Sequence, residues 1–211
     1  MIERFFAGVV ETRACRQLLE AAGVISWGFE PAGLRVTRKR YPGSDVLSLF
    51  RGFAPDARVD ASLDLFQRIC PTLEALHQQG RGHGAVHPQN VLFHNERLKL
   101  VDTGLNRARM FAFGAGPIAR TTPQLDYAVW LWAATCPREL TWTEWDHVSL
   151  LWTCTLLASG EDARPWSPLE MLDACEEWAE DMQGRLPAGA DDLPRLKRAY
   201  SLALKAATCC S

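Results

Sequence analysis

Apolar residues recur at helical spacing in some stretches of the chain and alternate with polar residues in others. In residues 9–22, Val10, Ala14, Leu18 and Ala21 share one face, so the pattern predicts a helix. Two short strand-like runs follow, at residues 24–29 and 34–41. The link between them contains proline and glycine, which favour turns, so the two runs are expected to form a β-hairpin.

Helical patterns dominate the following part of the chain. Residues 46–52 are expected to form a short helix, because Ser44 and Asp45 precede them as capping residues. Residues 60–79 have the spacing of a longer amphipathic helix, and Gly80 follows as a stop signal.

A second small hairpin is expected where two short apolar runs, residues 91–93 and 98–101, flank a polar link. Residues 106–124 show no periodicity and are expected to form a loop. Residues 125–207 have mostly helical patterns and are rich in tryptophan. The tryptophans of this part are expected to lie mostly in the core: Trp130, Trp132, Trp142, Trp145 and Trp152. Small β regions combined with a larger helical part predict the α+β class.

Composition and charge exclude several classes of protein. The 211 residues are 47% hydrophobic and 23% charged, as in ordinary globular domains. The net charge of −2 predicts no partner among nucleic acids, and no apolar run is long enough to span a membrane. Seven cysteines without zinc spacing predict reduced thiols in a cytoplasmic protein, with Cys15, Cys70 and Cys154 buried in helices.

The segment HGAVHPQNVLF followed by LKLVDTGL resembles the catalytic loop and the metal-binding loop of protein kinases. His83 takes the first position of the family pattern His-x-Asp, and Asn90 takes the asparagine position. Asp102 begins the segment that matches the Asp-Phe-Gly motif. Asp146 resembles the buried aspartate near the start of helix F, with Asp126 as the weaker candidate.

The resemblance implies a kinase-like α+β fold with a reduced N-lobe. Residues 1–43 would form this N-lobe, which consists of helix C at residues 9–22 and a short β-hairpin. Residues 44–211 would form a mostly helical C-lobe. The sequence contains no Gly-x-Gly-x-x-Gly loop and no lysine before Lys39, so the usual phosphate clamp of the family is missing.

Two further positions depart from the family pattern. Ala85 occupies the position of the catalytic aspartate, and a methyl group can neither accept nor orient a proton. His87 replaces the loop lysine and is mostly uncharged near neutral pH. Phosphoryl transfer depends on such positioned charges, so we expect a pseudokinase that is not an enzyme.

Asn90 and Asp102 match the two residues that hold Mg²⁺ in the family, so Mg-ATP could bind weakly. Alternatively, both residues cap turns by hydrogen bonding to the backbone, in which case no cofactor is expected. Two other functions use the same pair: an atypical nucleotide-dependent transferase, and a nucleotide-binding switch without turnover. Nucleotide binding in the presence of Mg²⁺ distinguishes them from a pure scaffold.

The expected hairpin at residues 24–41 leaves an apolar strand edge, and isolated hairpins are only marginally stable in water. Residues 1–8, a second copy of the chain or a different protein could cover it. We therefore expect a regulatory scaffold that binds a protein partner, in a hetero-complex or a homodimer, through this edge.

Overall fold

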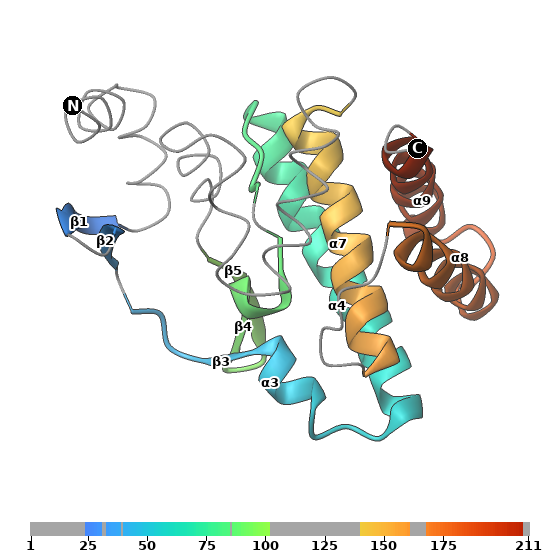
Figure 1. The fold of residues 1–211 in the computed structure, drawn as a ribbon. Coiled ribbons are helices and arrows are strands. Elements are labelled where there is room, and N and C mark those ends of the chain that lie inside the picture. Colours follow the sequence, from blue (N-terminus) through green and yellow to red (C-terminus); the bar gives the residue numbers. More distant parts are fainter. Residues whose placement is uncertain are drawn as a thin grey trace.

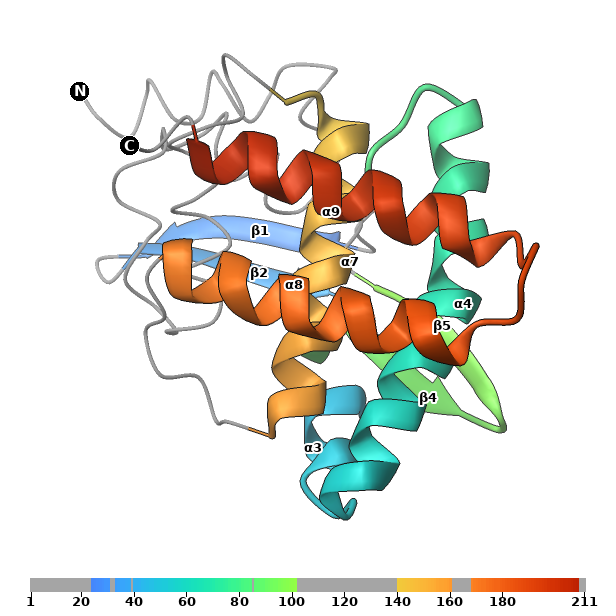
Figure 2. The ribbon, with the colours of Figure 1, turned by 90° about the vertical axis from the view of Figure 1, so that its right-hand side faces the viewer.

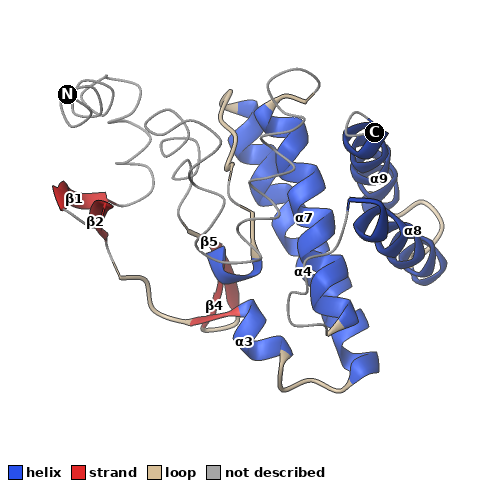
Figure 3. Cartoon of the chain, in the orientation of Figure 1, coloured by secondary structure: helices blue, strands red, loops and turns tan. Residues whose placement is uncertain are grey.

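The structure is a computed structural model, and it combines helices with two small antiparallel sheets (Figures 1 and 3). It describes residues 24–30, 33–38, 40–84, 86–101, 140–160 and 168–208. The α+β class predicted from the sequence is confirmed. The expected helix at residues 9–22 and the expected loop at 106–124 lie outside the described residues.

Strands β1 (Val24–Glu30) and β2 (Gly33–Arg38) pair antiparallel, which confirms the first predicted hairpin. The second strand ends at Arg38, three residues earlier than the predicted strand-like run. The ring of Tyr41 lies instead under the ammonium group of Lys99, with 4.0 Å between Nζ and the ring centroid. This cation–π contact fixes the connection that leads from the hairpin to the rest of the chain.

A second sheet has the order β3 (Ser44–Asp45), β4 (Val91–His94) and β5 (Arg97–Leu100), all antiparallel. The hairpin of β4 and β5 was predicted. Its two-residue turn has positive φ angles of 48° at Asn95 and 62° at Glu96, as a tight hairpin turn requires. Strand β3 was not predicted, because two residues are too few to show a period.

Helices α3 (Val46–Phe50) and α4 (Pro55–Gln78) follow. The Asp45 side chain caps α3 as predicted, since its Oδ1 accepts a hydrogen bond of 2.9 Å from the Ser48 amide. Helix α4 begins five residues earlier than its amphipathic pattern, because a proline suits the first helical position. Gly80, which follows its end, has a φ of 69° that glycine adopts without strain.

In the described ranges the remaining helices are α7 (Trp142–Ser159), α8 (Pro168–Arg185) and α9 (Asp192–Thr208). They confirm the helical prediction for these residues, while residues 125–139 and 161–167 lie outside the described part of the chain. Figures 1 and 2 show α8 and α9 as an outer layer that covers α4 and α7. The small sheet lies on the other side of these two helices, and the β1–β2 hairpin lies beyond it.

The hydrophobic core lies mainly among these four long helices. The largest fully buried apolar side chains are Phe66, Ile69, Leu73, Leu150, Leu151, Leu157, Met182 and Leu196. Trp145 and Trp152 are buried as predicted and meet edge to face, with 5.5 Å between ring centroids. Cys70 and Cys154 are also buried, as predicted. Within the described ranges, no helix combines the length and apolar character that crossing a membrane requires.

Candidate functional site

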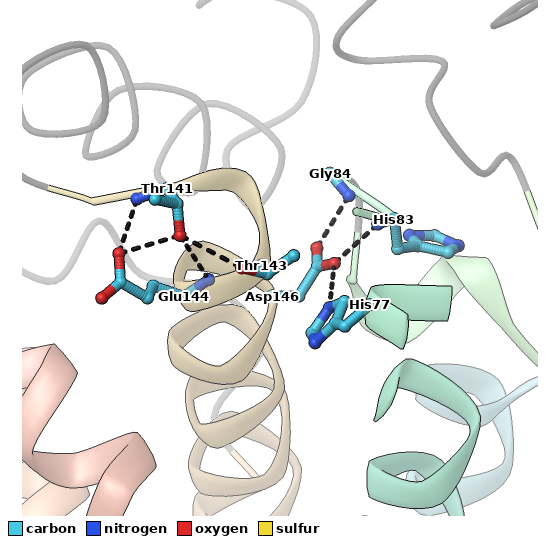
Figure 4. Close-up of polar contacts among 7 residues, drawn as sticks. All are labelled: His77, His83, Gly84, Thr141, Thr143, Glu144 and Asp146. Carbon is cyan, nitrogen blue, oxygen red and sulfur yellow. Dashed lines mark hydrogen bonds and ion pairs between the residues drawn. The ribbon is translucent and has the colours of Figure 1, made fainter. Parts of the chain in front are cut away.

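The loop that resembles the kinase catalytic loop is held by one buried carboxylate. Asp146 lies near the start of α7, and its side chain is fully buried. Its Oδ2 accepts a hydrogen bond of 2.6 Å from the His83 amide, and its Oδ1 accepts one of 2.7 Å from the Gly84 amide. Figure 4 shows Asp146 pointing away from its helix toward these two amides. The sequence-based expectation of a buried aspartate at this position is confirmed, whereas Asp126 lies outside the described residues.

The last turn of α4 contributes a third partner to Asp146. The Nε2 atom of His77 lies 3.0 Å from Oδ2 (Figure 4). The ring of His77 also meets the ring of His147 edge to face, with 5.1 Å between centroids. Sequence reasoning missed His77, although its position at the end of an amphipathic helix, six residues before His83, was visible.

A capping box fixes the start of α7 beside this carboxylate. Thr141 Oγ1 accepts a hydrogen bond of 3.3 Å from the Glu144 amide, and Glu144 Oε2 accepts one of 2.8 Å from the Thr141 amide. These contacts lie on the other side of the helix start from Asp146 (Figure 4). They hold the first turn of α7, and therefore the direction in which Asp146 points.

His83 is a fully buried residue of the loop. Burial lowers the pKa of its imidazole, while the Asp146 carboxylate and the Val101 carbonyl act in the opposite direction. The neutral ring therefore serves as a packing group that ties the loop to the end of β5.

His87, in the position of the family's loop lysine, is buried with 5% of its surface exposed. Its Nδ1 accepts a hydrogen bond of 3.2 Å from the Gln89 amide and caps the short 3₁₀ helix η1 (Pro88–Asn90). Burial lowers its pKa to about 4, so the ring is neutral near pH 7, as predicted. A neutral, buried ring that caps a turn cannot stabilise the charge of a transferring phosphate.

Of the two residues expected to hold Mg²⁺, the structure describes only Asn90. Asn90 is the last residue of η1. Its backbone N–H donates to the His87 carbonyl at 2.8 Å, and its backbone carbonyl accepts from the Val101 N–H at 2.9 Å. Asp102 and Ala85 both lie outside the described residues. Among the residues that the structure describes, no group of three or more His, Cys, Asp or Glu side chains could hold a metal ion.

The described residues of this loop have a fixed backbone and no charged side chain among His83, Gly84 and His87. The described part of the loop contains two neutral buried imidazoles, and its backbone is fixed by Asp146. Comparison of the chain with protein-family models, curated proteins and solved structures finds no match. The function is therefore inferred from the residues and geometry of this chain.

Proposed function

We propose that this protein is a catalytically inactive, kinase-like protein that works by binding other proteins. The observation that carries the proposal is the pair of Asp146 hydrogen bonds to the His83 and Gly84 amides. They hold the loop in a defined conformation, although the loop carries alanine and histidine where chemistry would need aspartate and lysine. A loop that keeps a defined backbone but has uncharged residues in the catalytic positions supports a role in binding other proteins.

The burial of His87 adds support. A catalytic cation must reach the transferring phosphate, yet this imidazole is buried, neutral near pH 7 and engaged with the Gln89 amide. Ala85, in the position of the proton acceptor, has no polar atom in its side chain. The two groups that would act on an acceptor hydroxyl are thus both replaced by groups without charge.

The β1–β2 hairpin supplies the expected partner surface. Within the described ranges, β1 and β2 pair only with each other, so each has one edge without a neighbouring strand. Such an edge is a template for strand addition by another chain. In this proposal a partner protein completes the sheet, and the partner's activity is regulated by that contact.

A phosphotransfer assay tests whether the protein is catalytically inactive. The purified chain is incubated with radiolabelled ATP, Mg²⁺ or Mn²⁺ and a general protein acceptor, beside Asn90→Ala and Asp102→Ala variants. We expect no label on any acceptor and no thermal shift with Mg-ATP in any of the three proteins. Label transfer that disappears in Asp102→Ala would instead establish the transferase. Nucleotide binding without transfer would establish the nucleotide-binding switch.

A photo-crosslinking experiment tests the partner surface. A photoreactive phenylalanine analogue replaces Val36 in β2 or, as a control, the exposed Leu204 in α9. We expect crosslinked partner protein from position 36 and none from position 204, with the crosslinked peptide identified by mass spectrometry. Equal crosslinking from both positions would contradict a partner at the hairpin.

A further inference from the structure

We propose that a groove between α3, α4 and the β4–β5 hairpin binds a short peptide segment of a partner protein, with bulky apolar side chains next to a basic one. The inference rests on the proposed function as an interaction protein, and it adds a second surface and the chemistry of its ligand. The groove has a volume of about 440 Å³. This lies within the range of roughly 300–1,000 Å³ that is typical of binding pockets.

Exposed aromatic side chains gather at this groove. In the described part of the chain, the large hydrophobic residues that remain exposed are Phe53 (39%), Phe93 (38%) and Leu204 (44%). Both phenylalanines line the groove, whereas Leu204 lies in α9. Single exposed apolar residues are ordinary, but two that share a concave surface indicate a binding site.

The α3 side of the groove is held in place by Arg58. Its Nε donates hydrogen bonds to the Phe50 carbonyl at 3.1 Å and to the Phe53 carbonyl at 3.0 Å. The two phenylalanine rings contact each other, with 5.3 Å between centroids. The backbone that carries the exposed Phe53 is therefore ordered before any ligand binds, which lowers the entropy that binding must overcome.

The opposite side is held by Arg68 of α4. Its Nε donates to Asp64 at 2.8 Å, and its Nη1 donates to the Glu96 carbonyl at 3.4 Å. These contacts connect the helix to the turn of the β4–β5 hairpin. Both walls of the groove are thus fixed by arginine contacts to backbone carbonyls.

The size of the groove indicates a short segment as its occupant. Eleven residues line it, whereas a standard protein–protein interface uses about 20–30 residues on each side. A second globular copy would need far more surface than this. A few bulky apolar side chains of one linear segment match the volume and the apolar lining, which includes Leu49 and Leu98.

The charges of the lining indicate the polar part of the ligand. Three charged residues line the groove: Asp64, Arg68 and Glu96. Arg68 forms an ion pair with Asp64, which leaves the exposed Glu96 carboxylate as the excess charge of the lining. A lysine or arginine beside the apolar residues of the segment would complement it and favour association at low salt.

The groove is separate from the loop held by Asp146. Asp64 and His77 are thirteen residues apart on α4, and a helix rises about 1.5 Å per residue, so they are about 20 Å apart. The α4 side of the groove is therefore remote from the contacts of Asp146. This separation allows the two proposals to be tested independently.

The test is selection of a displayed library of random twelve-residue peptides on the full-length chain, followed by fluorescence anisotropy with the enriched peptides. We expect peptides that combine bulky apolar residues with lysine or arginine. Phe93→Asp and Phe53→Asp should each weaken their binding at least tenfold. Glu96→Lys should weaken it about threefold and reduce its salt dependence, and Leu204→Asp serves as the matched control with unchanged affinity.

Several outcomes would contradict the proposal that this groove binds a peptide. These are the absence of any enriched peptide, equal binding by wild type and both phenylalanine variants, enrichment of acidic peptides, or a concentration-dependent dimer that Phe93→Asp abolishes. Thermal melting of each variant establishes that it is folded, and the second phenylalanine variant guards against local unfolding in the first. Label transfer from ATP together with intact peptide binding would contradict the proposed lack of catalytic activity and would still support peptide binding at the groove.

Discussion

The Nε2 atom of His77 lies 3.0 Å from Oδ2 of Asp146, although 69 residues separate them in the sequence. With the His83 and Gly84 amides, the histidine completes a set of three polar contacts around one buried carboxylate. A buried anion is tolerated because these contacts replace its hydration. The end of α4, the loop and the start of α7 are therefore held together by a single side chain.

Replacing Asp146 by asparagine should destabilise the protein by about 2–4 kcal/mol, because an NH₂ group cannot accept from the second backbone amide. The measurement is the free energy of unfolding in urea. The control is Asp181→Asn, which removes an exposed ion pair with Arg185 and should cost less than about 0.5 kcal/mol. Similar losses in the two variants would contradict the role of Asp146.

Acid should weaken the fold through its buried histidines, because burial lowers the pKa of His83, His87 and His147. Burial lowers the pKa of His87 and His147 from 6.5 to about 4. Between these values the unfolded chain binds more protons than the folded one, so stability is complete above pH 6.5 and falls as the pH is lowered toward 4. By pH 5 the loss should be about 2 kcal/mol for each histidine.

Urea unfolding at several pH values between 7.5 and 5 measures this effect. His147→Gln should remove its share of the pH dependence, since the glutamine side chain does not titrate in this range. An unfolding free energy that stays constant over the range, or a slope unchanged in the variant, would show that these rings are not buried in neutral form.

A buried hydrogen bond should couple α4 to α8. The indole Nε1 of Trp178 donates to Ser62 Oγ at 2.9 Å, and this hydroxyl donates in turn to the Val59 carbonyl at 2.6 Å. Ser62→Ala leaves the indole N–H unpaired in the core and should cost about 1–3 kcal/mol. In a Trp178→Phe background the same change should cost about 1 kcal/mol less. Additive losses in this double-mutant cycle would contradict the coupling.

Three thiols should be inert in the folded protein. Burial raises the pKa of Cys70 and Cys175 to about 12 and that of Cys154 well above its usual value. The thiolate is the reactive form, so maleimide should label these three cysteines only after denaturation. Peptide mapping by mass spectrometry follows each site. Rapid labelling of any of them under native conditions would show that this part of the core opens readily.

Local patterns were enough to predict much of the fold. The capping residue Asp45, the two hairpins and the buried Trp145 and Trp152 all follow from features within a few residues of each other. The start of α4 was misplaced because its first three residues are exposed, so they add nothing to the buried apolar face on which the pattern depends. The buried position of Asp146 was predicted from a resemblance, although its partner His77 was not.

The sequence by itself determined which side chains are available: alanine and histidine in the loop, and no carboxylate or lysine within residues 83–90. Only the tertiary structure decided what those side chains do. It brought His77 to Asp146 and made His87 a neutral cap, and it placed Phe53 and Phe93 in the lining of one groove. These relationships depend on contacts between distant segments, because burial and packing arise only when the helices and the small sheet come together.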